Sequence, residues 1–349
     1  MRTLESSYIL SIYNQVKETS ISGRWITLNH LKRVFSKYDS NEVIAYNEIG
    51  KSEENRPIHQ FSFGNGKRKI LIWTQMHGNE STGTKAVFDL LNYMTIAKDE
   101  FSTSIFNNCT IKIIPIVNPD GAEYYTRVNA NSIDLNRDAV DRSAKESQLL
   151  RAQLDEFQPD FCFNLHDQRT IFGVEGTLNP ATLSFLAPSE EITRKLTEGR
   201  KRTMNVIVAM NKLMQTIIPN HIGRYTDEFY PTATGDNFQK LGYPTVLIES
   251  GHYPEDYERE ESRFFTFSAL IQGIAHIASA ENFDEFEEYF TIPDNSKNFR
   301  DLLHKYSNRQ NEAFQYEEIL ENNKINFIPK KVTDDISALF FHKEIVFED

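Results

Sequence analysis

A histidine and a glutamate three positions apart, His77 and Glu80, are the pair in this chain best suited to chemistry. They follow the apolar run 70–73 and open a segment with helical periodicity, so both side chains should lie on the same side of a helical turn. A neutral imidazole and a carboxylate that point the same way can share one Zn²⁺. A catalytic zinc commonly takes three protein ligands and keeps a fourth position for water. The pair therefore predicts part of a zinc site that still needs a third ligand, a base and a substrate clamp.

The third ligand should be another histidine at the end of a strand. His166 fits best, because it follows the strand-like segment 160–165. His221 and His252 offer less and are candidates for lining the pocket. A lone His-x-x-Glu pair also occurs by chance on protein surfaces. Here the pair gains weight from the predicted strand before it and the predicted helix after it.

A hydrolytic zinc also needs a base that takes a proton from its water. Glu249 directly follows the largely apolar segment 244–248, so it lies at a functional edge or in solvent beyond the strand. Because His77 and His166 also lie at strand ends, we favour the functional role. A partly desolvated carboxylate would have a raised pKa, which suits a base near neutral pH.

A substrate clamp is suggested by a long polar stretch, 118–142, that has little periodicity. Loops of this length inside a compact domain are uncommon and usually functional. Arg127, Asn136 and Arg137 lie in it, and the planar fork of arginine matches a carboxylate. In a chain this acidic, the alternative is that these arginines form ordinary surface ion pairs.

The elements that must position these residues alternate between strand and helix. This alternation predicts an α/β fold with a mixed, mostly parallel central sheet and helices on both faces. Ligands bind beyond the carboxyl ends of the strands in such sheets. His77, His166 and Glu249 each lie just after a predicted strand, which favours one shared site.

Three parts are expected along the chain: a helical N-terminal segment over 1–45 packed on the main domain, a catalytic domain over 46–290, and a small C-terminal appendage over 291–349. Two details can be checked against a structure. Pro115 in a predicted strand indicates an edge strand or a bend. Ser143 and Glu146 match a capping box at the start of a predicted helix.

The composition excludes several classes of protein. The net charge of −12 argues against nucleic acid as a partner, since phosphate binding needs a basic face. No apolar run is long enough for a membrane span, and the N-terminus does not resemble a secretory signal. Cys109 and Cys162 both lie in strand-like segments, which indicates two buried thiols rather than a disulfide. The cytoplasm is the expected compartment.

Together, these motifs occur in an order that resembles the zinc carboxypeptidase family typified by carboxypeptidase A. The resemblance covers roughly residues 60–255 and implies that family's three-layer α/β/α fold. The matching residues in chain order are His77 and Glu80, Asn118-Pro119-Asp120-Gly121, Arg127, Asp134-Leu135-Asn136-Arg137, His166 and Glu249.

By that resemblance, three side chains would bind one zinc per chain, with a water as the fourth ligand: His77, Glu80 and His166. Glu249 would activate this water as the general base. Asp134 would orient the imidazole of His77 from behind.

The resemblance also assigns the substrate contacts. Arg127 would stabilise the oxyanion, and Asn136 with Arg137 would hold the terminal carboxylate of the substrate. The family has a mobile tyrosine upstream of the base. Tyr230 matches it best, and Tyr225 is the rival.

The expected function is therefore that of a zinc metallocarboxypeptidase acting on the C-terminal bond of a peptide. Two alternatives stay open within the same chemistry: an N-acyl amino acid hydrolase like aspartoacylase or succinylglutamate desuccinylase, and a cell-wall peptide amidase. The substrate would be a peptide or an acylated amino acid with a free carboxylate. A non-catalytic relative that only binds peptide ends is the third reading. Asp138-Ala139 after Arg137 departs from many family members, which leaves the substrate more open than the chemistry.

Overall fold

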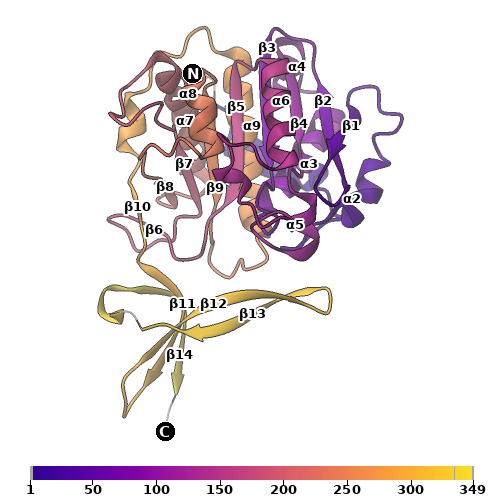
Figure 1. Ribbon diagram of the computed structural model, residues 1–349. Helices are drawn as coiled ribbons and strands as arrows, with labels where there is room; N and C mark the ends of the chain where they lie inside the picture. Colours follow the sequence, from indigo (N-terminus) through magenta and orange to yellow (C-terminus); the bar gives the residue numbers. More distant parts are fainter. Residues whose placement is uncertain (1–2, 334, 348–349) are drawn as a thin grey trace.

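A mixed sheet forms the centre of the protein (Figure 1); the computed structural model describes residues 3–333 and 335–347. Within these residues its eight strands lie in the order β1-β2-β4-β3-β5-β9-β7-β8. Their bounds are β1 Ala45–Lys51, β2 Pro57–Phe63, β3 Arg68–Thr74, β4 Cys109–Ile114, β5 Phe161–Asp167, β7 Leu183–Leu186, β8 Ile222–Arg224 and β9 Thr245–Ser250. Parallel pairings join β4, β3, β5 and β9 in the middle. The predicted mixed, mostly parallel sheet is confirmed.

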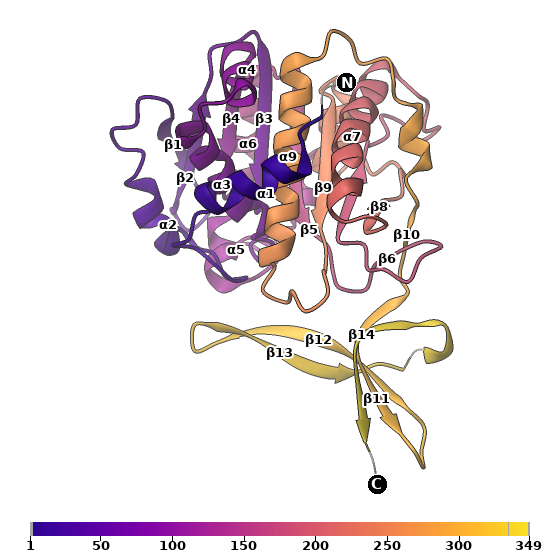
Figure 2. The same cartoon turned by 180° about the vertical axis from the view of Figure 1, so that it is seen from behind.

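Helices cover both faces of this sheet because its central strands are apolar on both sides. Ile70 and Ile72 of β3 pack into one hydrophobic cluster, and Leu71 and Trp73 pack into another, as the two-residue period of a strand requires. The first cluster includes side chains from α1 (Ser6–Val16), α2 (Leu28–Phe35), α3 (Thr82–Ile96), α4 (Glu100–Asn108), α7 (Glu198–Ile217) and α9 (Glu260–Ser279) (Figure 2). The second includes side chains from α6 (Lys145–Phe157) and α8 (Thr234–Lys240) (Figure 1).

The N-terminal segment is hydrogen-bonded to an arginine of the main domain that also forms a buried ion pair. Arg263 of α9 donates to both oxygens of Asp89 of α3, at 2.7 and 2.6 Å, and both side chains are fully buried. The same guanidinium donates to the carbonyls of Glu18 and Ile21 at 2.8 and 2.9 Å. Because α1 also contributes to the first hydrophobic cluster, this segment packs as part of the same core.

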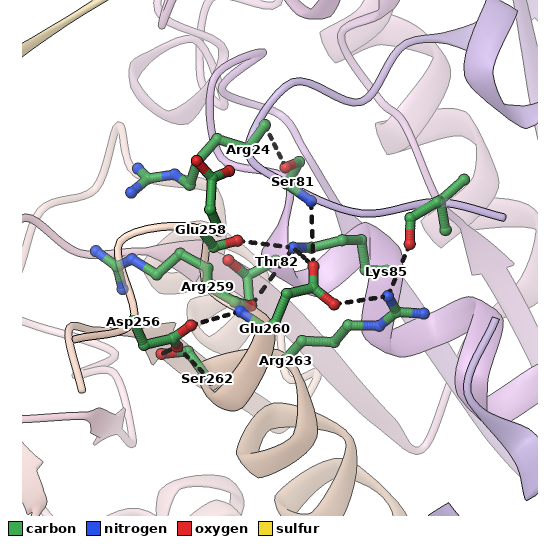
Figure 3. A network of polar contacts seen from close by, with 12 residues as sticks. Arg24, Ser81, Thr82, Lys85, Asp256, Glu258, Arg259, Glu260, Ser262 and Arg263 are labelled. Atoms are coloured by element: carbon green, nitrogen blue, oxygen red, sulfur yellow. Dashed lines mark hydrogen bonds and ion pairs between the residues drawn. The ribbon is translucent and has the colours of Figure 1, made fainter. Parts of the chain in front are cut away.

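Figure 3 shows a polar network that continues from this ion pair toward the start of α3. Lys85 donates to Glu260 Oε1 at 2.7 Å and to the carbonyl of Arg259 at 3.4 Å. Ser81 donates to the carbonyl of Arg24 at 2.6 Å. Burial lowers the pKa of Lys85 to about 8, although the nearby Glu260 carboxylate opposes this. The network holds the loop that carries Arg24 against the helix that follows the predicted metal ligands.

One predicted detail is confirmed in one of its two alternatives, and another is wrong. β4 ends before Pro115 and lies between β2 and β3, so this proline marks no edge strand, but it does lie at a bend directly after the strand. The predicted capping box is absent at the start of α6, where Ala144 is the N-cap residue. The Asp138 carboxylate instead accepts hydrogen bonds from the amides of Ser143 and Ala144, each at 2.9 Å. Glu146 is buried and accepts a bond from Asn129 at 3.1 Å.

The long polar stretch contains two short helices, α5 (Pro119–Tyr124) and η1 (Leu135–Arg137). None of the helices in the described part of the chain is long and apolar enough to cross a membrane.

Beyond η2 (Glu287–Thr291) the chain forms a second sheet. A short pairing of β10 (Asn295–Ser296) with β6 (Gly173–Val174) leads into it. The strands are β11 (Phe299–Tyr306), β12 (Glu312–Glu321), β13 (Lys324–Lys331) and β14 (Phe340–Phe347), with η3 (Ile336–Ala338) before the last. Their order is β13-β12-β11-β14, and β11 pairs parallel with β14. Figure 1 shows β12 and β13 lying across the end of the main domain that also carries α5.

Candidate metal centre and active site

The three predicted metal ligands lie together. One donor atom from each of His77, Glu80 and His166 lies within 4.8 Å of the others. His77 Nδ1 lies 2.8 Å from Glu80 Oε1, and His166 Nδ1 lies 2.8 Å from Glu80 Oε2. Two imidazole nitrogens and one carboxylate oxygen form a donor set that catalytic zinc uses. The residues present therefore fit a zinc ion.

Adjacent strands of the sheet bring these residues together. His77 and Glu80 lie between the end of β3 and the start of α3, while His166 lies near the end of β5, which pairs with β3. Glu249 lies in β9, and its Cα is the register partner of the His166 Cα. The shared edge is the carboxyl end of parallel strands, as predicted for a ligand site.

Gly78 lets the turn that carries His77 and Glu80 approach the turn of residues 118–121 closely. A Cβ on Gly78 would lie 1.9 Å from the carbonyl carbon of Gly121, which is closer than non-bonded atoms can come. Asn118 supports the same contact, because its side chain donates to the Met76 carbonyl at 3.2 Å and accepts from the Gly121 amide at 2.8 Å. The turn of residues 118–121 thus forms the support on which the His77–Glu80 turn lies.

Asp134 connects His77, a predicted metal ligand, to Arg127, the arginine predicted to stabilise the oxyanion. His77 Nε2 lies 3.0 Å from Asp134 Oδ1, which turns Nδ1 of the same ring toward Glu80. Arg127 Nε donates to Asp134 Oδ2 at 3.0 Å, and its Nη1 donates to Glu80 Oε1 at 3.3 Å. Burial alone would raise the pKa of Asp134, but His77 and Arg127 hold it well below its ordinary value. Asp134 therefore stays ionised and fixes both neighbours.

Glu249 has the properties that a general base requires. Burial raises its pKa well above the ordinary value, and the negative charges of Glu80 and Asp167 add to this rise. Arg127 opposes the rise, so its guanidinium also acts on this carboxylate. A carboxylate that binds a proton more strongly than usual accepts one from water more readily.

The predicted carboxylate clamp lies on the short helix η1. Asp134 starts this helix by accepting the Asn136 amide at 2.9 Å. Asn136 Oδ1 accepts from the Thr234 amide at 2.9 Å, which fixes its side chain against α8. Arg137 is exposed and donates to the Asn136 carbonyl at 2.7 Å, so most of its guanidinium faces solvent.

The two candidate tyrosines occupy different environments. Burial raises the pKa of Tyr225 well above its ordinary value, and the charges of Glu249 and Glu80 add to this, so its hydroxyl lies within electrostatic range of both carboxylates. Tyr230, the better match by motif, is 47% exposed and donates to Glu228 at 2.6 Å. Spacing in the sequence could not distinguish a tyrosine within electrostatic range of Glu249 from an exposed one that is hydrogen-bonded to Glu228.

One buried residue near the site, Arg259, could not be predicted from any motif in the sequence. Arg259, at the start of α9, is buried and donates to the carbonyls of Gln168 and Ser250 at 2.8 and 2.7 Å. It thereby joins the chain just beyond His166 to the end of β9.

His252, a predicted pocket neighbour, is buried with its ring 4.0 Å from that of His342 and outside the ligand cluster. His221 likewise lies outside that cluster, and its ring packs 5.5 Å from Tyr253.

A cavity of about 310 Å³ adjoins the ligand cluster. Its lining includes Glu80 and Arg127 on one side and Tyr316, Glu318 and Phe327 of the second sheet on the other. The C-terminal appendage predicted from the sequence therefore contributes to the surroundings of the metal centre.

Comparison with known proteins relates part of the chain to one family. The family described as zinc carboxypeptidase matches residues 31–166, which include all three predicted metal ligands and Arg127. Carboxypeptidase 2 of Trichophyton rubrum is 30% identical over 139 residues, 37% of this chain and 26% of that protein. Carboxypeptidase E of Caenorhabditis elegans is 32% identical over 122 residues, 29% of this chain and 26% of that protein. The chain thus spans about a quarter of the length of these curated relatives.

Solved structures agree on the fold. A metallo-carboxypeptidase from Burkholderia cenocepacia superposes with a TM-score of 0.58 at 18% identity and covers 71% of this chain and 68% of its own. Carboxypeptidase A from Helicoverpa armigera gives a TM-score of 0.57 at 17% identity, covering 79% of this chain and 81% of its own. The match to the zinc carboxypeptidase family thus covers residues 31–166, which include the His-Glu-His cluster, and the solved structures share the fold of this chain.

Proposed function

We propose that this protein is a zinc-dependent metallocarboxypeptidase that hydrolyses the C-terminal peptide bond of a peptide. The observation that carries the proposal is the convergence of His77, Glu80 and His166 at the strand end beside Glu249. A zinc ion held by these three ligands would polarise the scissile carbonyl and lower the pKa of a bound water.

The remaining steps fall to side chains of the chain itself. Glu249 takes a proton from the attacking water and passes it to the leaving amine. Arg127 donates hydrogen bonds to the oxygen on which negative charge develops. Asp134 keeps Arg127 and His77 in place through its two oxygens.

The clamp determines where the bond is cut. Asn136 and Arg137 hold the free carboxylate of the substrate, so that cleavage falls one residue from the end. Arg137 is available for this because its guanidinium is largely exposed. Tyr230 lies within electrostatic range of Arg137 and is proposed to close over the same carboxylate. Fixing the substrate away from the reacting carbon orients that carbon for attack.

The test uses the purified full chain with its metal content measured. Peptides that vary in their last residue are incubated with it, together with an N-acyl amino acid, and the products are identified by mass spectrometry. We expect one zinc per chain and release of single C-terminal residues. Release only from the N-acyl amino acid would instead favour an acyl amino acid hydrolase.

A matched variant tests the base. Glu249→Gln keeps the shape of the side chain but cannot take a proton, so turnover should fall by roughly 10²- to 10⁴-fold while zinc content is retained. Normal turnover in the zinc-replete variant would refute the assignment. A cytoplasmic location stays a separate prediction, which cell fractionation tests.

A further inference from the structure

The cavity beside the metal centre has a far wall that belongs to the C-terminal sheet. On the side of the main domain it is lined by Glu80, Arg127 and the segment 167–170 that follows His166. On the other side it is lined by residues of three strands of the second sheet: Asp301, Gln315, Tyr316, Glu318 and Phe327. The cavity therefore runs from a predicted metal ligand to the second sheet, which lies outside the matched family segment 31–166.

This cavity lies on the amino side of the scissile bond if the proposed function holds, and the inference rests on that function. The carboxylate clamp is Asn136 with Arg137, and neither lines the cavity. Arg127, which lies at the reacting carbonyl, does line it. A substrate that runs from the clamp past Arg127 therefore continues into the cavity with the residues before the cut.

Strand β12 closes the end of this path by joining two loops of the main domain. Glu318 pairs with Arg24 at 2.9 Å and accepts a hydrogen bond from Tyr125, two residues before Arg127. Gln315, three residues earlier on the strand, donates to Thr170 Oγ1 at 2.6 Å. Three residues of strand span about 10 Å. One strand thus connects the loop that carries Arg127 with the loop that follows His166.

Further contacts hold the sheet in this position. His342 Nε2 of β14 lies 2.7 Å from the Thr170 carbonyl oxygen. Tyr257 donates to Asp301 at 3.0 Å, and its ring lies 5.3 Å from the rings of both Tyr316 and Phe327. The sheet is therefore fixed to the main domain by part-buried polar contacts and aromatic contacts from all four of its strands.

The strand register separates wall residues from residues on the opposite face. Glu318 and Phe327 are Cα partners, so their side chains project to the same face of the hairpin as Tyr316, and all three line the cavity. The neighbouring Cα partners, Glu317 and Ile328, project to the other face. Glu317 pairs there with Lys330 at 3.2 Å.

We propose that the C-terminal sheet is the end wall of the substrate cleft and restricts the enzyme to short peptides. Tyr316 and Phe327 are its specificity-determining residues, because they form the aromatic part of the wall. A cavity of about 310 Å³ is of the size that accommodates a small ligand, and residues of the second sheet line its side away from Glu80 and Arg127.

The first test is a length series on the zinc-loaded full chain. Peptides share the same C-terminal dipeptide and grow at the amino end from a dipeptide to a decapeptide. We expect kcat/KM to fall by about tenfold or more once the peptide outgrows the cavity. Equal cleavage of all lengths would overturn the inference and leave the proposed function intact. No cleavage at any length would instead contradict the proposed function.

The second test removes the wall. Phe327→Ala and Tyr316→Ala should raise the ratio of kcat/KM for long over short peptides by about tenfold, whereas Ile328→Ala should leave this ratio unchanged. Equal ratios in Phe327→Ala and Ile328→Ala would overturn the inference. If a wall variant fails to fold, as judged by its melting curve and zinc content, the length series on the unmodified chain still decides.

Discussion

His77 turns its Nε2 atom toward Asp134 Oδ1 at 3.0 Å and, as a result, presents Nδ1 to Glu80. The orientation of the first metal ligand therefore depends on a residue that does not itself belong to the ligand cluster.

Asp134→Asn should weaken zinc binding. The amide keeps the shape but loses the charge that accepts from both His77 and Arg127, so zinc affinity should fall about 10- to 100-fold. Competition with a chelator of known affinity measures it. Asp141→Asn, at an exposed position in the same loop, is the control. Unchanged affinity in Asp134→Asn would show that packing alone orients the ring.

Arg127 and Arg137 should affect different kinetic constants. Arg127→Gln removes a donor to the developing oxyanion, so kcat should fall by about 10²- to 10³-fold. Arg137→Gln removes a contact that the substrate makes before and during reaction, so KM should rise with little change in kcat. Steady-state kinetics on one peptide distinguishes them. The reverse pattern would mean that the two roles have been exchanged.

Replacing Tyr225 and replacing Tyr230 should change different kinetic constants in the same steady-state assay. Tyr225→Phe removes a hydroxyl that lies within electrostatic range of Glu249, so we expect a loss in kcat of about tenfold. Tyr230→Phe should mainly raise KM for substrates with a free carboxylate. If only Tyr230→Phe lowers kcat, the outer tyrosine moves in during the reaction.

Asp89→Asn should destabilise the fold without changing any residue of the candidate active site. It leaves the guanidinium of Arg263 buried beside an uncharged amide, so the free energy of unfolding should fall by about 3–5 kcal/mol. Urea denaturation measures this. The control is Asp155→Asn, which breaks an exposed pair with Arg151 and should cost at most about 1 kcal/mol. Similar losses in both variants would contradict the argument.

Acid should destabilise the protein through His252 and His342. Burial lowers the pKa of both imidazoles, and the nearby Arg259 lowers them further, while Asp301 opposes this only at His342. The unfolded chain binds a proton on each ring near about pH 6.5 and the folded chain does not. Stability is therefore present above this pH and is lost as the pH falls below it.

Thermal melts at a series of pH values check this prediction. The melting temperature should drop less steeply below about pH 6.5 in His252→Gln than in the unmodified protein. Identical slopes would mean that other groups govern the acid response.

Much of the catalytic fold could be predicted because three central strands, β3, β5 and β9, end close to residues that can do chemistry. Apolar runs such as 70–73 alternate with helical periodicity, and the residues after them meet at one edge of the sheet. The ligands follow from that geometry, since His77 and Glu80 are local and His166 needs only the pairing of β3 with β5. The Ser143 cap was mispredicted because the loop supplies a stronger acceptor in Asp138, which binds two amides at once.

The role of the C-terminal sheet could not be predicted, because it depends on docking between distant segments. β12 and β13 are largely half-exposed, so they lack the apolar alternation that marks a buried face. The contacts of Glu318 with Arg24 and of Gln315 with Thr170 join positions far apart in the chain. No local pattern carries such information.

The close contact of Gly78 with Gly121 fixes the turn of residues 77–80 against the turn of residues 118–121. The Gly121 backbone occupies the space that a methyl group on Gly78 would need, while the Asn118 side chain and the Val128 carbonyl occupy the space that one on Gly121 would need. Anyone who transplants the zinc ligands into another scaffold must carry the second turn with them. A library that varies either position alone should return glycine, whichever substrate is used for selection.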